Sequence, residues 1–286
     1  MCGGFDDITI TNQCWKYNNQ TGSNQWQPIR SMSTGRVWFK LVSTDDSKLV
    51  YAIGGQTDRH IDTDSCESYD PQTNQWKLLK PLAFSRDGMG AAVLNNTIYV
   101  CGGYDDNTLK RHIECEYYSH ADNDWHFTRS MIQVRAYFEL VALGGNMYAI
   151  GGDIGGMYLN TVERYDLASH QWQLVAGMHK NRSGHAAVAY MGKIYVCAGD
   201  SYTNNTCESY DPIRNQWTLI APMNEIKRMA DLQLLVYHGQ LHAMGGQSPV
   251  TDSIEIYNQT TNQWHYSSQT LPHKSMAFGV TVLKKH

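Results

Sequence analysis

The 286-residue sequence has little charge, few prolines and no long apolar run. Charged residues make up 17% of it and the net charge is -4, so it lacks the positive field that a nucleic-acid-binding protein presents. No apolar stretch approaches the roughly 18 residues of a membrane-spanning helix. No basic segment followed by an apolar one opens the chain, so we expect no signal peptide. The hydrophobic content of 42% suffices for a packed core and argues against disorder.

Sustained helical periodicity is also absent, and what recurs instead is a repeat. Glycine pairs stand at 3–4, 54–55, 102–103, 151–152 and 245–246, and Ala198-Gly199 fills the remaining gap. Their second members are 51, 48, 49, 47 and 47 residues apart. A tryptophan follows each pair, at Trp26, Trp76, Trp125, Trp172, Trp217 and Trp264. The sequence therefore contains six units of about 48 residues each.

Each unit contains four short β-type segments, which we call strands a, b, c and d. In the unit around residues 86–130 we expect them at 90–94, 98–101, 114–118 and 124–127. Four strands in a period of this length are typical of a propeller blade rather than of a solenoid coil. The sequence predicts an all-β, six-bladed propeller with four antiparallel strands per blade, forming a single domain over 1–286.

The two ends of the chain look like complementary parts of one blade. Residues 1–4 begin inside a strand b, and 278–283 have the pattern of a lone strand a. We expect one blade to be shared between 1–30 and 274–286, with the C-terminal strand closing the ring and removing exposed edges. We also expect this chain to have been cut from a longer protein whose missing part lies upstream.

The repeat resembles the kelch repeat. After Ala198-Gly199 come Glu208-Ser209-Tyr210-Asp211, Asn215-Gln216-Trp217 and Pro222-Met223, and the likeness covers essentially the whole chain. The pattern is most similar to the propellers of the BTB-Kelch (Kelch-like) family. This resemblance implies a substrate receptor that binds a degron peptide, with upstream BTB and BACK domains that bind cullin-3 and dimerise. It implies a monomeric propeller in a homodimeric parent. We expect the protein in the cytoplasm, with the nucleus as an alternative.

The seven cysteines fall into two columns of the repeat. Cys14, Cys66, Cys115 and Cys207 lie three before the strand-c tyrosine, whereas Cys2, Cys101 and Cys197 lie one before the glycine pair. We interpret them as packing thiols without disulfides, because free cysteine behaves as a small buried hydrophobe. Reactive sensor thiols and metal ligands are the alternatives. The odd count and the absent signal peptide favour a reducing compartment.

No motif for catalysis or cofactor binding is found: CxxC, HExxH, GxGxxG and the P-loop are all missing. Galactose-oxidase-like enzymes share the kelch fold and use a copper site, but nothing local marks such a site here. We expect no enzyme activity, no cofactor and no metal. Partner proteins, rather than nucleic acid or membrane, are the expected ligands.

Loop lengths locate the expected binding surface. The b–c loops and d–a links emerge on one face and are long and varied, whereas the opposite face has tight turns such as 95–96 and 144–145. Arginines and aromatics gather on the first face, a composition that suits a peptide ligand. The predicted partner-binding residues, including the pocket columns implied by the family resemblance, are Phe5, Arg36, Trp38, Gln56, Arg86, Tyr104, Arg135, Tyr137, Asp153, Arg182, Ser183, Asp200, Tyr202, Arg228, Gln247, Lys274 and Ser275.

The arginines have an alternative role. Glutamates recur two residues before the strand-c tyrosine, at Glu67, Glu116, Glu163, Glu208 and Glu255, and some arginines could pair with them and hold the blades. For function, the sequence favours the substrate-recognition propeller of a cullin-3 ubiquitin ligase adaptor. A cytoskeletal scaffold propeller of the actin-binding type is the alternative, and an enzyme is the third class.

Overall fold

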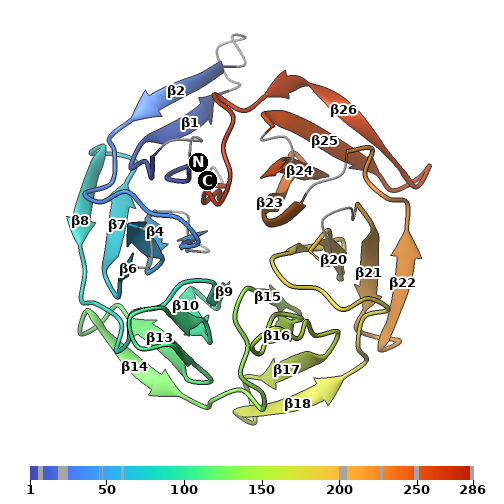
Figure 1. The fold of residues 1–286 in the computed structure, drawn as a ribbon, viewed down its shortest axis with the longest axis horizontal. Helices are drawn as coiled ribbons and strands as arrows, with labels where there is room; N and C mark the ends of the chain where they lie inside the picture. Colours follow the sequence, from blue (N-terminus) through green and yellow to red (C-terminus); the bar gives the residue numbers. More distant parts are fainter. Residues whose placement is uncertain are drawn as a thin grey trace.

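The computed structural model describes residues 1–5, 9–18, 25–44, 46, 48–58, 61–199, 205–225, 228–247 and 251–283. All regular structure in these ranges is β, and none of them contains a helix, so none contains one that could span a membrane. Viewed down its axis, the chain forms a ring of sheets that radiate from the centre (Figure 1). Strands a lie innermost and strands d outermost, and both termini lie near the axis.

Five antiparallel sheets have four strands each. In chain order they are β3 (Lys40–Ser43), β4 (Val50–Ile53), β7 (Cys66–Asp70) and β8 (Gln75–Leu78); β9 (Gly90–Leu94), β10 (Thr97–Cys101), β13 (Cys115–Ser119) and β14 (Asp124–Thr128); β15 (Glu139–Leu143), β16 (Asn146–Ile150), β17 (Val162–Asp166) and β18 (Gln171–Val175); β19 (Ala186–Tyr190), β20 (Lys193–Cys197), β21 (Cys207–Asp211) and β22 (Gln216–Ile220); and β23 (Arg228–Tyr237), β24 (Gln240–Gln247), β25 (Ser253–Asn258) and β26 (Gln263–Thr270). Two b–c loops carry small hairpins, β5 (Gln56–Asp58) with β6 (Ile61–Asp62), and β11 (Tyr104–Asp105) with β12 (Lys110–Arg111). The strands expected in the unit around 86–130 are confirmed to within a residue or two.

The prediction of six four-stranded blades is wrong, because the described chain forms five. The remaining unit forms a two-stranded sheet, β1 (Cys14–Asn18) with β2 (Gln25–Ile29). Cys2 makes isolated bridges to Cys14 and to Gly279, and the ladder extends no further on either side. Residues 280–283 form no strand, so the C-terminal segment contributes two isolated bridges, Gly279 with Cys2 and Met276 with Phe5, instead of the expected closing strand.

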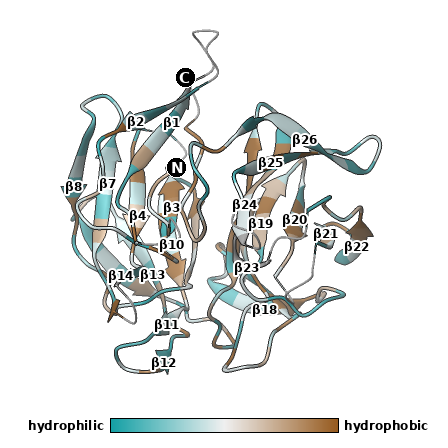
Figure 2. Cartoon of the chain, turned by 45° about the horizontal axis from the view of Figure 1, so that its top comes forward, coloured by the Kyte–Doolittle hydropathy of each residue, from teal (hydrophilic) through white to brown (hydrophobic). Residues whose placement is uncertain are grey.

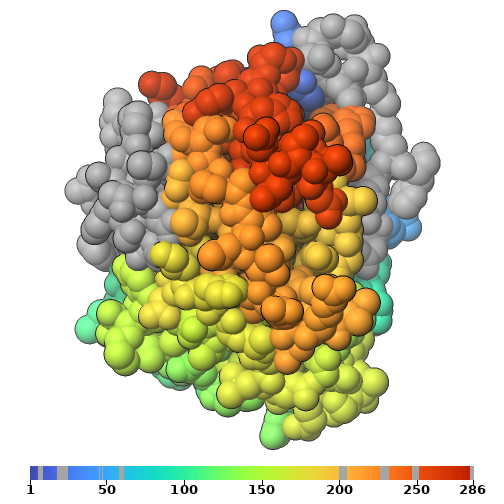
Figure 3. Space-filling model, turned by 90° about the vertical axis from the view of Figure 1, so that its right-hand side faces the viewer, coloured from blue at the N-terminus to red at the C-terminus, as the bar shows by residue number. Residues whose placement is uncertain are grey.

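Tryptophans join each sheet to the one before it. The indole N–H of Trp125 donates to the carbonyl of Lys80 at 3.1 Å, and Trp172 donates in the same way to Arg129 at 2.9 Å. Trp26 of β2 donates to the carbonyl of Thr270 at 2.8 Å, which links the two-stranded sheet to the end of β26. The apolar core lies between neighbouring sheets, and Figure 3 shows the fourth and fifth sheets packed in one continuous surface.

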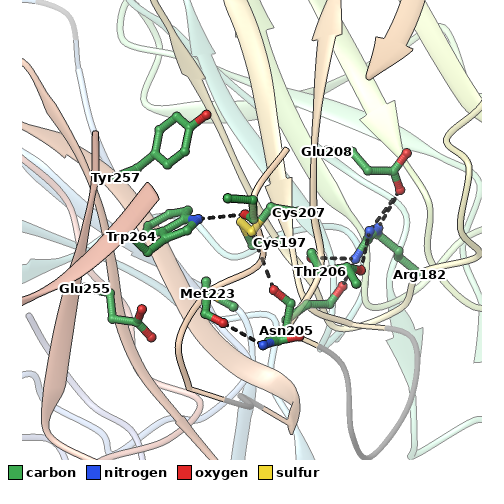
Figure 4. The surroundings of a disulfide bond; sticks show 12 residues. Arg182, Cys197, Asn205, Thr206, Cys207, Glu208, Met223, Glu255, Tyr257 and Trp264 are labelled. Atoms are coloured by element: carbon green, nitrogen blue, oxygen red, sulfur yellow. Dashed lines mark hydrogen bonds and ion pairs between the residues drawn. A yellow bond between two sulfur atoms is a disulfide. The ribbon is translucent and has the colours of Figure 1, made fainter. Parts of the chain in front are cut away.

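The expectation of free packing thiols is also wrong. Disulfides join Cys2 to Cys14, Cys101 to Cys115 and Cys197 to Cys207, and Cys66 is the free cysteine. The physical reason is the ladder: the column before the glycine pair lies directly opposite the column three before the tyrosine. Cys66 is unpaired because its ladder partner is Ile53. Figure 4 shows the bridge between Cys197 and Cys207.

One buried histidine occupies an otherwise apolar column. Beneath the first glycine of successive pairs lie the side chains of Phe39, Met89, Phe138, His185 and Phe278. His185 is 3% exposed, and neither of its ring nitrogens makes a hydrogen bond. Burial lowers its pKa from the ordinary 6.5 to about 3, and the nearby Arg182 charge adds to the effect. The imidazole is therefore neutral in the folded protein at pH values where the unfolded chain binds a proton.

His185→Phe should remove an acid sensitivity of the fold. Because the folded-state pKa is depressed, the stability that the neutral ring permits is complete above pH 6.5 and is lost as the pH falls toward 3. Between pH 7.5 and pH 5 this single group should lower the free energy of unfolding of the native protein by about 2 kcal/mol. Denaturant titrations at both pH values should show that loss reduced by this amount in the variant. An equal loss in both proteins would contradict the assignment.

Candidate partner-binding surface

The b–c loops and d–a links lie side by side, as the loop pattern predicts. In four units the residue after the glycine pair exchanges backbone hydrogen bonds with a residue of a d–a link, giving the pairs Phe5 with Met276, Gln56 with Val37, Tyr104 with Asp87, and Asp153 with Ala136. The glycines allow this approach: a Cβ on Gly102, at φ +62°, would lie 2.5 Å from the Arg135 carbonyl oxygen. We call the surface formed by these loops and links the loop face; the β11–β12 hairpin projects from it (Figure 2).

An arc of backbone hydrogen bonds joins five d–a links around the axis at the loop face. The N–H of Trp38 donates to the Ala277 carbonyl, Gly88 to Trp38, Tyr137 to Gly88, and Gly184 to Tyr137. All five residues have positive φ, between 51° and 63°. Trp38 and Tyr137 are half-buried, and the Tyr137 ring covers Gly88. The structure thus brings these two predicted aromatic residues to the axis.

Four of the predicted contact arginines are buried inside the sheets. Arg36, Arg86, Arg135 and Arg182 are all 0% exposed and pair with Glu67, Glu116, Glu163 and Glu208 at 2.9, 2.6, 2.7 and 2.9 Å. Each guanidinium also donates to the carbonyl of the first residue of the glycine pair, as Arg135 does to Gly151 at 2.6 Å. This geometry matches the alternative, scaffold role. Contact with a partner would require these side chains to leave the sheets.

Near the C-terminus the repeat spacing predicts Lys274 at the position that arginine occupies in other units, and the structure shifts this position by one residue. Phe5 pairs with Met276 as Gln56 pairs with Val37, so Ser275, and not Lys274, occupies the arginine position. Ser275 is fully buried, and its hydroxyl makes no hydrogen bond. Trp15 stands where the other units have glutamate, so this unit lacks the buried ion pair. Lys274 itself is exposed.

Three polar residues form a hydrogen-bonded cluster between the first two sheets. The Gln56 amide donates to Asp62 and to Asp106, both at 3.2 Å. A separate pair lies nearer the axis, where the Tyr137 hydroxyl donates to the Asp87 carboxylate at 3.2 Å. Burial raises the pKa of Asp87 well above its usual range, and the charge of Asp62 adds to the rise. Burial likewise raises the pKa of Asp62.

Sequence reasoning missed the half-buried arginine on this face. The Arg111 guanidinium stacks on the Tyr104 ring at 4.7 Å and donates to Asp153 at 2.8 Å, so it links the second and third sheets. Exposed apolar side chains stand beside it in sequence and in the next loop: Leu109 is 73% exposed and Met157 is 64% exposed. Arg111 belongs to no repeat column, so its place in a long b–c loop was the only signal that the sequence offered.

The remaining predicted residues are placed only in part. Ser183 is buried, and its N–H donates to the Gly199 carbonyl. Arg228 and Gln247 face each other at the ends of β23 and β24. Asp200 and Tyr202 lie outside the described residues. Within the described ranges, no three His, Cys, Asp or Glu side chains are grouped so that they could hold a metal ion.

Comparisons with known proteins agree with this architecture. Kelch-like protein 36 of Rattus norvegicus is 27% identical over 65% of this chain, and Kelch-like protein 26 of Danio rerio is 29% identical over 67%. Kelch-like protein 40 of Mus musculus is 35% identical over 44% of the chain. The matched part spans 31% of the first two relatives and 21% of the third.

Structure and family models extend the match. The solved structure titled "Structure of YjhT" superposes with a TM-score of 0.77 at 14% identity, covering 93% of this chain and 96% of that one, which shows the fold alone. The model of the KLHDC2/KLHL20/DRC7 Kelch-repeats domain matches residues 39–246, nearly three quarters of the sequence. The chain therefore belongs to the KLHDC2/KLHL20/DRC7 Kelch-repeats domain family.

Proposed function

We propose that this chain is a non-catalytic protein-interaction propeller that binds a short segment of another protein on the loop face. The observation that carries the proposal is a group of aromatic, basic and apolar side chains that the loop face presents together. Leu109 and Met157 are largely exposed, and Tyr104 is half-buried under the Arg111 guanidinium. Aromatic and arginine side chains are the residue types that most often anchor a protein partner.

The finer role that we propose is substrate recognition for a cullin-3 ubiquitin ligase. The Kelch-like names of the relatives support it, and those relatives are about three times as long as the part matched here. In this proposal, BTB and BACK domains of the longer protein bind cullin-3 and form the homodimer, while the propeller selects the target. A location in the cytoplasm, with the nucleus as the alternative, stays a prediction. The three disulfides remove the support that it drew from free cysteines.

The double substitution Tyr104→Ala, Arg111→Ala should abolish partner capture. Loss of one anchor, which commonly costs about 2 kcal/mol, weakens binding by about 30-fold, and loss of both should weaken it further. Affinity capture from cells with the full-length protein would identify partners, and titration of a recovered partner would measure the loss. A melting temperature close to that of the native protein would show that the fold is intact.

Gln72→Ala is the matched control, because Gln72 is exposed on a tight c–d turn of the opposite face. It should leave capture unchanged. Loss of the partner in the Gln72 variant, with retention in the double variant, would place the binding surface on the other face. If the ligase role is right, cullin-3 should co-purify with the full-length protein. This association should persist in the loop-face variants.

A further inference from the structure

A small cavity opens on the axis at the loop face. It holds about 50 Å³, and its walls include the aromatic side chains of Trp38 and Tyr137 and the small residues Gly88, Gly184 and Ala277. These five are the members of the arc of backbone hydrogen bonds described above. A volume of this size accommodates a few water molecules or a group of three or four heavy atoms. The cavity is therefore large enough for the end of one side chain.

An ion pair lines this cavity, formed by the residues two positions after Trp38 and Tyr137. Lys40 begins β3 and Glu139 begins β15, and their side chains meet at 2.6 Å across the axis, past the intervening β9–β14 sheet. Both side chains remain reachable, at 20% and 18% exposure. The bond between them uses one ammonium N–H and one carboxylate oxygen, while an ammonium has three donors and a carboxylate two oxygens.

A guest group must match both charges at once. A carboxylate placed here would approach Glu139, and an ammonium would approach Lys40, so either charge meets a like charge at short range in a partly desolvated site. A neutral carboxamide has a carbonyl oxygen that can accept from Lys40 and an NH₂ group that can donate to Glu139. Three of its heavy atoms carry this recognition, which fits the volume.

We propose that the axial cavity is a specificity pocket for one neutral, doubly hydrogen-bonding side chain of the partner, an asparagine or glutamine carboxamide. The proposal rests on the proposed function, in which a peptide segment lies across the loop face. The Lys40–Glu139 pair then selects against acidic and basic residues at the position that enters the axis.

Small probes test the pocket without a known partner. With ¹⁵N-labelled tryptophan, the indole N–H signal of Trp38, assigned through Trp38→Phe, reports on the cavity wall. Acetamide should shift this signal saturably, with a dissociation constant of about 10–100 mM, as expected for so few heavy atoms. Sodium acetate and methylammonium chloride should bind at least about tenfold more weakly. Equal binding of acetate or methylammonium, or no shift with acetamide, would overturn the proposal.

Two variants test the role of the ion pair. The charge exchange Lys40→Glu, Glu139→Lys should keep the preference for acetamide, whereas Lys40→Met, Glu139→Met should abolish it. Retention of the preference in the Met variant would overturn the proposal. The surface pair Lys80–Asp124, which meets at 3.2 Å far from the axis, gives the control Lys80→Ala, Asp124→Ala, with unchanged probe binding. The other indole signals show whether each variant folds. If a variant does not fold, the probe titrations of the wild-type protein still test the proposal.

Failure here is separable from failure of the proposed function. The probe experiment involves no partner, so a negative result leaves peptide recognition at Tyr104 and Arg111 to be judged by partner capture. Conversely, acetamide could bind selectively while the Tyr104→Ala, Arg111→Ala variant still captures its partner. That result would support the pocket and reject the peptide surface around it.

Discussion

Arg135→Ala is expected to lower the free energy of unfolding by about 3–5 kcal/mol. The guanidinium is fully buried and donates to the carbonyl oxygens of Gly151 and Thr161, at 2.6 and 3.1 Å, as well as to Glu163. Its removal leaves the Glu163 carboxylate buried without its counter-charge and leaves two carbonyls without this donor. Removing one partner of a buried ion pair destabilises a protein strongly, whereas replacing both partners by apolar residues is often neutral. Denaturant titration of the purified propeller measures the change.

Arg214→Ala is the matched control. Arg214 has a side chain that is 78% exposed and stands 4.0 Å from Asp211, so its loss should change the unfolding free energy by about 0.5 kcal/mol or less. If Arg135→Ala instead kept full stability while partner capture was lost, Arg135 would be a contact residue that leaves the sheet on binding. The buried geometry predicts the reverse order, in which unfolding explains any loss of capture.

The repeat columns predicted most of the local structure because each column has one environment in every sheet. The tryptophan column packs against the preceding sheet, and the column after the glycine pair lies on the loop face. The same columns contained the arginine–glutamate pairing, since the two residue types recur at fixed positions in four sheets. What the columns left open was whether an arginine is buried, because burial depends on the neighbouring strands.

Features that break the repeat were not predictable from it. Ser275 takes the arginine position and Trp15 the glutamate position, so the motif fixes no register there. Arg111 and the Lys40–Glu139 pair appear in single units, and contact across the axis has no signature in sequence spacing. The ladder of the unit at the chain ends stops at Cys2, which a count of repeat motifs does not reveal.

The cysteine pairing, in contrast, could have been predicted from the columns. Strands b and c are adjacent in every blade, so two columns that face each other across this ladder bring their cysteines together wherever both are present. Three units have both cysteines, and the fourth has Ile53 opposite Cys66. Treating each column as packing alone overlooked the antiparallel register between them.

Cys101→Ala, Cys115→Ala is expected to lower the free energy of unfolding by about 3 kcal/mol, the cost of opening a closed loop of roughly this length. The two residues are 14 apart in sequence and directly opposed on β10 and β13. The native protein in reductant should be less stable than this variant without reductant, because reductant also opens the two other disulfides. Denaturant titrations with and without reductant measure both effects.

Cys66→Ala separates the cross-link from packing, since Cys66 is buried and free. This variant should lose only the small packing contribution of one sulfur and should keep the full response to reductant. Alkylation of the denatured, non-reduced protein should modify one cysteine of the seven, and prior reduction should expose all seven. Seven reactive thiols without reductant would instead support seven packing thiols and restore the argument for a reducing compartment. One reactive thiol would leave the cytoplasmic prediction without the support it drew from the cysteines, because disulfides persist in oxidising surroundings.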